Sequence, residues 1–245
     1  MRRVCAWTAV AAALAASCGS GSGGSSLQPG PRRQMLRSLT STVIVPTYQQ
    51  LVTAAGALLH AAEQLDASPD APALAATQQA WRDARAVWKQ SEAFTIGPAK
   101  TLSIAAKIDF APAKPERIET EIRGSTALSS AYVEELGANV KGFLALEYLL
   151  FDPDRGDAAV VDRLAASPRR RGFVRVLAEN LRDQAILVRD AWDPAAGNFS
   201  AQFGDAGQGS ATYPTVKSAV DELVNQLIFL SEDIADAQHE CRPRI

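Results

Sequence analysis

Apolar residues recur at intervals of three and four positions along most of this chain, which is the spacing of one face of an α-helix. The first run covers residues 48–65, and we expect its helix to begin before Pro46 and to bend there. A turn signal at residues 68–70 ends it. A second run over residues 74–91 stops at Gly97-Pro98. The pattern therefore predicts two long helices joined by a short turn.

The second half of the chain repeats this pattern. Ser167-Pro168 is typical of a helix start, and the apolar stripe that follows predicts a helix up to Trp192. Residues 216–234 carry a similar stripe, after a long Gly-, Ala- and Ser-rich connection at residues 193–212. Prolines interrupt residues 101–123, so we expect two short helices with an irregular crossing there. Because no segment alternates with the period of a strand, the predicted fold is all-α, built of up-and-down helical bundles.

The first residues have the features of a secretion signal. Arg2 and Arg3 precede an apolar segment that is too short to span a membrane as a mature helix. Small residues then lead to Cys18 in a pattern that resembles the lipobox of bacterial lipoproteins, although Leu14 lies one position further from the cysteine than that pattern prefers. We expect residues 1–17 to be a signal peptide and Cys18 to carry a lipid. Ordinary cleavage after a small residue is the alternative.

This signal sets the expected domain organisation and location. Residues 18–33 would form a flexible Gly/Ser-rich tether, and residues 34–245 the helical domain. We expect the protein in the cell envelope, anchored by lipid to the outer membrane and facing the periplasm. Cys5 leaves with the signal, so Cys18 and Cys241 remain, and no disulfide within the mature chain is expected.

Charge and hydropathy exclude two classes of protein. The formal net charge is −2, whereas a nucleic-acid binder needs a basic face, so we expect no nucleic-acid partner. Nothing after the signal is long and apolar enough to cross a bilayer.

Glu147 is the single carboxylate in the apolar run at residues 142–151. On a helix it shares a face with Leu144, Leu150 and Phe151, so we expect it to enter a core or a pocket. A buried carboxylate without partners is costly, and it must be paired, protonated or bound to a cation. Two interpretations follow, a structural ion pair and a ligand-binding or active-site carboxylate.

One predicted helix carries a second group of functional candidates. Two indoles, a cation and an anion share one face at steps of four, three and four, namely Trp81, Arg85, Trp88 and Glu92. Arg85 can stack on either indole, and an ion pair between Arg85 and Glu147 would neutralise the lone acid. The alternative is a helix whose charged ends simply extend into solvent.

Taken together, three separated segments resemble the imelysin-like family in composition and order. They are Trp81-x-x-Ala84-Arg85-x-x-Trp88-x-x-x-Glu92-x-Phe94-x-x-Gly97-Pro98, Ile108-Asp109-Phe110-x-Pro112, and the run from Gly142 to Phe151. The resemblance extends roughly from Val45 to the C-terminus. It implies a bacterial envelope protein built of helical bundles, with a kinked first helix and a short Gly-x-x-x-x-Glu helix. The family includes an insulin-cleaving protease and relatives implicated in iron uptake.

The chain departs from this family at its metal motif. The family has Gly-x-His-x-x-Glu, and here the His position is Leu144, which cannot bind a metal. The only two histidines, His60 and His239, lie in other predicted helices without ligand-like spacing around them. The chain also ends where longer relatives continue, so we expect a second bundle to be incomplete or the product to be truncated.

The resemblance and the motifs give one expected function and two alternatives. We expect a binding or accessory component in iron or solute uptake that works with other envelope components, with the ligand-binding candidates Glu147, Arg85, Glu92, Trp81, Trp88, Asp109 and Gly142. Glu147 is also the candidate ligand for iron or another divalent metal. In the peptidase alternative, Glu147 acts as general base or metal ligand with Glu92 and Asp109 as helpers. The third reading is a structural scaffold for envelope partners.

Overall fold

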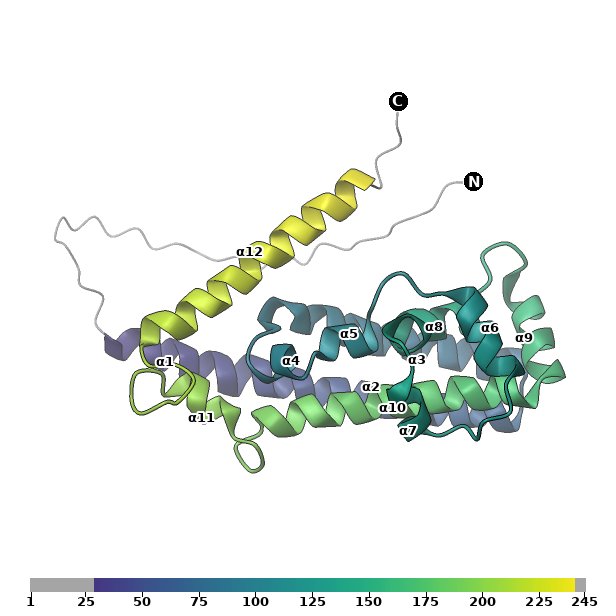
Figure 1. Cartoon of the computed structure of the whole chain (residues 1–245), viewed down its shortest axis with the longest axis horizontal. Coiled ribbons are helices and arrows are strands. Elements are labelled where there is room, and N and C mark those ends of the chain that lie inside the picture. The colour runs from purple at the N-terminus through teal and green to yellow at the C-terminus, as the bar shows by residue number, and fades with distance from the viewer. Residues whose placement is uncertain (1–28, 241–245) are drawn as a thin grey trace.

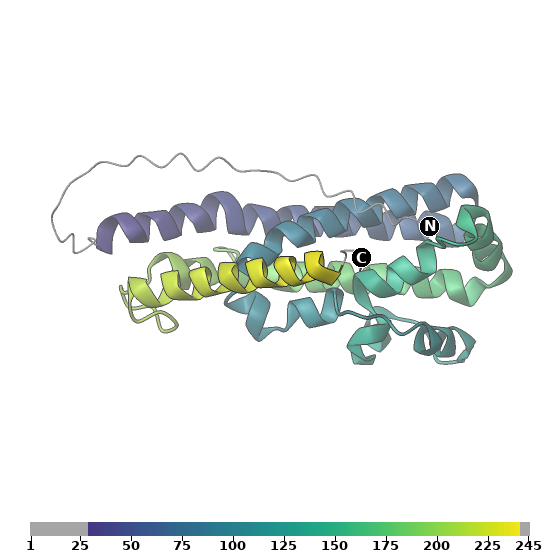
Figure 2. The same ribbon diagram turned by 90° about the horizontal axis from the view of Figure 1, so that it is seen from above.

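Long helices run side by side along the molecule. The computed structural model describes residues 29–240, and within that range it contains helices and no strand. α2 (Val45–Ala67) packs against both α3 (Ala71–Ser91) and α10 (Pro168–Trp192), as Figures 1 and 2 show. The all-α bundle predicted from the sequence is therefore confirmed. The predicted signal peptide, Cys18 and the first part of the predicted tether lie outside the described residues. Residues 29–33 of that tether are helical instead, because the first helix begins at Pro29.

The first helix begins before Pro46, as predicted. α1 (Pro29–Leu39) continues through a π-helical turn, η1 (Thr40–Ile44), directly into α2. Proline has no backbone N–H to donate to the carbonyl four residues earlier, and its ring crowds that carbonyl. The widened turn next to Pro46 accommodates this proline, and the Val45 N–H donates to the carbonyl of Thr40 instead.

Polar caps set where the long helices start. The Asp70 side chain accepts from the backbone N–H of Ala73 at the start of α3. Ser167 accepts in the same way from Arg170 at the start of α10, where Pro168 occupies the first turn. Each cap satisfies a backbone donor that the helix itself leaves free.

Short helices cover the region between α3 and α10 in the chain. They are η2 (Glu92–Phe94), α4 (Pro98–Thr101), α5 (Ile104–Ile108), α6 (Pro115–Arg123), α7 (Ser130–Glu135), η3 (Ala138–Val140), α8 (Gly142–Leu150) and α9 (Gly156–Ala166). The interrupted helix expected over residues 101–123 is thus confirmed. α8 packs between α3 and α10, which brings the Gly142 to Phe151 segment onto the second predicted helix.

The long connection after α10 carries an aromatic cluster. Within it, α11 (Phe199–Gly204) places Phe199 and Phe203 edge-on against Trp192, and Tyr213 packs on both phenylalanines. Trp192 and Phe203 are fully buried. These contacts explain why a connection of this length is tolerated, because it completes the core at this end of the bundle.

The last helix leaves the bundle. α12 (Val216–Glu240) contacts α1 and η2 near its start and then projects away from the other helices (Figure 1). Among the described helices none combines the length and the low polarity needed to cross a membrane.

Candidate functional site

Five charged side chains from three parts of the chain meet beside α3. Arg85 and Lys89 lie on α3, Glu92 follows at η2, Asp109 comes directly after α5, and Glu147 lies on α8. We call these five residues the charged cluster. α3 and α8 pack against each other, and α5 packs against α8, which explains how segments far apart in the sequence converge here.

Asp109 is the buried acid at the centre of this cluster. Its side chain is 5% exposed, and its Oδ2 accepts from Trp88 Nε1 at 3.1 Å and from Lys89 Nζ at 2.7 Å. Its Oδ1 lies 3.3 Å from Arg85 Nη1. Two cations and an indole N–H thus compensate one buried carboxylate, which is the condition for burying such a charge.

Glu147 is not buried, and the expectation that it enters a core or pocket is wrong. Its side chain is 48% exposed, while Phe143, Leu146 and Leu150 of α8 are buried. In a short helix that is apolar almost all round, the inward face is set by packing, and the one charged residue takes the outward face. The predicted contact with Arg85 does form, with Arg85 Nη1 3.6 Å from Glu147 Oε2.

Trp81 joins α3 to α8 next to the charged cluster. Its Nε1 donates to the carbonyl of Phe143 at 3.0 Å. The Arg85 guanidinium lies 5.3 Å from the centre of the Trp81 ring, which is within the range of a cation–π interaction. Of the two indoles of α3, the Trp81 ring therefore contacts the guanidinium of Arg85, and Trp88 donates a hydrogen bond to Asp109.

Glu92 pairs within its own helical segment rather than with another helix. Lys89 Nζ lies 2.7 Å from Glu92 Oε1. Burial raises the pKa of Glu92 above its ordinary value, and the bond from Lys89 opposes that shift only in part. Burial alone would lower the pKa of Lys89, but hydrogen bonds to Asp109 and Glu92 outweigh it and raise that pKa.

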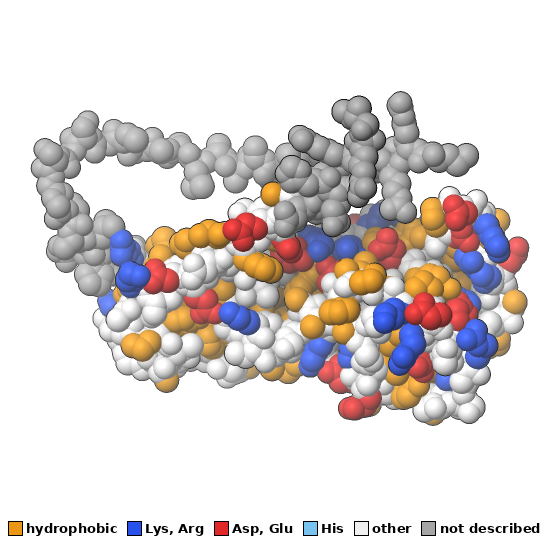
Figure 3. Space-filling view, turned by 45° about the horizontal axis from the view of Figure 1, so that its top comes forward, with side chains coloured by type: hydrophobic (Ala, Val, Ile, Leu, Met, Phe, Trp, Pro, Cys, Tyr) orange, Lys and Arg blue, Asp and Glu red, His pale blue; other side chains and the backbone are white. Residues whose placement is uncertain are grey.

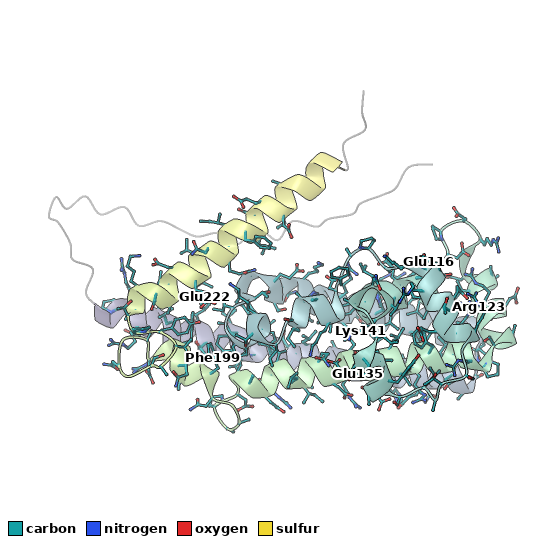
Figure 4. The ribbon with its side chains drawn as sticks, in the orientation of Figure 1. Glu116, Arg123, Glu135, Lys141, Phe199 and Glu222 are labelled. Atoms are coloured by element: carbon teal, nitrogen blue, oxygen red, sulfur yellow. The ribbon has the colours of Figure 1, made fainter. Side chains whose placement is uncertain are left out.

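A groove opens between α12 and the bundle, next to these residues. Its volume is about 920 Å³, and Lys89, Glu92 and Asp109 form part of its wall. Two hydrogen bonds fix α12 here, from Gln226 Nε2 to the Glu92 carbonyl at 2.9 Å and from the Gly97 N–H to Glu222 at 3.4 Å. Glu222 lies on the part of α12 nearest the bundle (Figure 4). We call this space the α12 groove.

Comparison with known proteins shows which family the chain belongs to. The sequence model for imelysin matches residues 44–242. This chain belongs to the imelysin family. The chain is also 29% identical over 204 residues to iron-regulated protein A of Synechococcus elongatus, a match that covers 82% of this chain and 52% of that protein. It thus spans about half the length of that curated relative.

Two solved structures have the same imelysin fold. One is described as an iron-regulated protein A precursor from Parabacteroides distasonis, with a TM-score of 0.67 and 21% identity, covering 80% of this chain and 56% of that one. The other is an imelysin-like protein from Psychrobacter arcticum, with a TM-score of 0.65 and 16% identity, covering 84% of this chain and 61% of that one.

The imelysin metal motif does not supply a metal site in this member. Leu144 offers no ligand, and the nearest charged partner of Glu147 is the Arg85 guanidinium. Within residues 29–240 no group of three or more His, Cys, Asp or Glu side chains could hold a metal ion. His60 is on the surface beside Glu63, and the His239 side chain lies outside the described part. The described residues therefore do not fit a resident metal.

Sequence reasoning missed Lys89 as a member of the site. Lys89 lies four residues after Arg85 and three before Glu92, so helical spacing places it on the same face. That signal was present in the sequence. Gly142 and the other candidates all lie at or next to the charged cluster.

Proposed function

We propose that this protein is a binding or accessory component in iron or solute uptake at the cell envelope. One observation carries the proposal: the α12 groove is open beside a charged cluster whose acids are held by lysine and arginine rather than arranged as metal ligands. Such a site recognises a solute by hydrogen bonds and charge instead of coordinating a bare ion.

The surroundings of the site support binding. The groove wall combines lysine, carboxylate and amide side chains with the apolar Ile96, Phe229 and Leu230. A few polar groups within a partly apolar wall are typical of small-molecule sites. Relatives that carry the name iron-regulated protein A connect the family with iron, which is why we place iron first among the solutes.

The proposal includes a place in the cell. A lipid on Cys18 would hold the domain on the outer membrane, facing the periplasm, where an uptake component meets incoming solute. The lipobox-like residues before Cys18 and the Gly/Ser-rich residues after it support this placement.

The peptidase alternative has less support. It needs Glu147 as a metal ligand or general base, with Glu92 and Asp109 as helpers. In the structure each of these acids contacts a cation of the cluster, and the position three residues before Glu147 is leucine. A metal-dependent hydrolytic site at Glu147 would need a second ligand, and Leu144 does not supply one.

Iron uptake by a deletion strain tests the proposal. Under iron limitation, we expect radioactive iron uptake to fall in the strain without this gene and to be restored by the wild-type gene. The Lys89→Ala variant should fail to restore it, because it loses the cation that joins Glu92 and Asp109 at the groove wall. Asp205→Asn is the matched control, since Asp205 pairs with Arg37 on the surface.

A different result of the same experiment would contradict the uptake proposal. Unchanged uptake in the deletion strain, together with cleavage of peptides by the purified protein, would replace the binding proposal with the peptidase. Measuring the metal content of the purified protein, with and without added iron, shows separately whether iron itself is the bound species.

A further inference from the structure

Positive charge is concentrated near the start of this chain. Residues 18–62 contain three arginines and no carboxylate, and the first acid of the sequence is Glu63. The three arginines are Arg32, Arg33 and Arg37, and all of them lie on α1. Figure 3 shows Lys and Arg side chains at the end of the molecule where the described chain begins. The α1 end therefore presents a basic surface, although the whole chain has a formal net charge of −2.

A pocket lies against α1 at this basic end. Its volume is about 540 Å³, and its wall is formed by Gly30, Pro31, Arg33, Gln34, Arg37 and Gln208. We call this space the α1 pocket. The wall contains two guanidinium groups and two side-chain amides, and no carboxylate lines it. Guanidinium and amide N–H groups are donors, so this lining favours an anionic ligand.

The two arginines of the pocket differ in what already holds them. The Arg33 Nε donates to the carbonyl of Ala206 at 3.2 Å, and among the described residues no acid pairs with this guanidinium. Its charge is therefore available to a ligand. The Arg37 Nε donates to Asp205 Oδ1 at 2.7 Å, which fixes this guanidinium at the pocket and offsets part of its charge. Phosphate oxygens suit such a pair, because a guanidinium can donate two parallel hydrogen bonds to them.

The place of α1 in the sequence indicates where a phosphate would come from. Residues 19–28 separate α1 from Cys18, the residue that the proposed function attaches to a lipid. A segment of this length spans at most about 40 Å, even when fully extended. A lipid on Cys18 would therefore keep α1 near the membrane, where the phosphates of anionic lipids are concentrated and attract arginine.

The pocket, its free charge and its distance from the anchor point to one ligand. We propose that the α1 pocket binds the headgroup phosphate of an anionic phospholipid, so that the α1 end of the bundle lies on the membrane surface. Arg33 and Arg37 contact the phosphate. Arg32 does not line the pocket and adds positive charge beside it.

This contact is separate from the solute site. The α1 pocket and the α12 groove share no lining residue, so a bound headgroup leaves the groove open. The choice of a lipid as the source of the phosphate rests on the lipid anchor of the proposed function. Binding of vesicles by a chain without that lipid does not depend on it, so the two proposals can fail separately.

Vesicle co-sedimentation tests the proposal with the mature chain from Cys18 onward, produced without its lipid. We expect at least about 10-fold tighter binding to phosphatidylcholine vesicles that contain about 30% phosphatidylglycerol than to pure phosphatidylcholine, at low salt. Arg33→Ala should weaken this binding about fivefold, the effect of one basic residue near an anionic surface. Arg33→Lys should restore it only in part, because lysine keeps the charge but loses the paired donors.

Arg155→Ala is the matched control. Arg155 is exposed and precedes α9, at the opposite end of the bundle from α1 (Figure 1), so this variant should bind like the wild type. Circular dichroism checks that all variants keep their helices. Equal weakening by Arg33→Ala and Arg155→Ala overturns the proposal, because binding would then follow overall charge. Full restoration by Arg33→Lys overturns the role of the pocket.

Titration calorimetry with inorganic phosphate separates the two sources of the same ligand chemistry. We expect weak binding of free phosphate compared with anionic vesicles, because a vesicle surface also attracts Arg32. Phosphate binding that requires Arg33, without any preference for anionic vesicles, would assign the pocket to free phosphate and overturn the membrane contact. Absence of both kinds of binding overturns the proposal as a whole.

Discussion

Gly142 lies directly against the backbone of Ile108. A Cβ atom on Gly142 would be 2.3 Å from the Ile108 carbonyl oxygen, and the glycine has a φ of +74°. No other residue fits this contact, because both the space and the backbone angle exclude a side chain. Since Asp109 is the next residue after Ile108, the glycine that starts α8 also determines where the buried acid of the charged cluster lies.

The first prediction uses this contact. Gly142→Ala should lower the free energy of unfolding by about 3 kcal/mol or more, from backbone strain and overlap with Ile108 together. Gly156→Ala is the control, because Gly156 has nearly the same φ, +75°, and nothing within 4 Å of the added Cβ. It should cost only about 1 kcal/mol. Urea unfolding of both variants measures the difference, and equal costs would refute the steric account.

The second prediction separates the two acids that face Arg85. Asp109→Ala should destabilise the protein by about 3 kcal/mol, because it leaves Arg85 and Lys89 without their buried partner. Glu147→Ala should cost less than about 1 kcal/mol, because that pair is half exposed and screened by water. Double-mutant cycles with Arg85→Ala should give the larger coupling for Asp109. A larger coupling for Glu147 would reverse the assignment of the buried acid.

The third prediction concerns pH. Burial raises the pKa of Glu92 above its ordinary 4.5, so in the window above pH 4.5 the folded protein binds more protons than the unfolded chain. Stability contributed by this group therefore falls as the pH rises through that window. We expect Glu92→Gln to gain stability relative to wild type between about pH 4.5 and neutral pH. Urea unfolding across this range measures it, with the exposed Glu116→Gln as control. A pH-independent difference contradicts the prediction.

The fourth prediction concerns proteolysis. With Leu144 in place of the motif histidine, the purified protein should not cleave unfolded proteins or peptides above background, with or without added zinc or iron. The measurement is peptide cleavage followed by mass spectrometry, in the presence and absence of a chelator. Chelator-sensitive cleavage that disappears in Glu147→Gln would establish the peptidase alternative.

The fifth prediction concerns the anchor. We expect the mature protein to begin at a diacylglyceryl-modified Cys18 and to fractionate with membranes. Mass spectrometry of the mature N-terminus decides this directly. An unmodified N-terminus downstream of Cys18, in protein from the soluble fraction, would show that ordinary cleavage had occurred instead.

Much of the fold could be predicted because its long helices carry strong apolar periodicity and clear caps. The pattern located α2, α3, α10 and α12 and the break between α5 and α6. Those signals are local, since spacing, prolines and capping side chains act within a few residues. The contact between Arg85 and Glu147 was also predictable, because Glu147 is the single charge in its apolar run and Arg85 shares the helix face that carries the two indoles.

The outward position of Glu147 was not predictable from the sequence. α8 is apolar on nearly every side, so its own pattern does not say which side faces the core. The packing of α3, α5 and α10 around it decides that, and this information is not local. For the same reason the buried acid is Asp109, whose sequence neighbourhood between α5 and Pro112 gave no sign of burial.

The π-helical turn at Thr40–Ile44 has a consequence for the whole N-terminal helix. A π turn contains one residue more than the α-helical turn it replaces, and each α-helical residue turns the chain by about 100°. If the same residues wound as a regular α-helix, the extra residue would rotate α1 by about 100° about its axis relative to α2. Leu36, now fully buried, would then swing out of the core while Tyr48 stayed in place. The widened turn thus takes up the extra residue, and the buried faces of α1 and α2 stay aligned along one continuous helix.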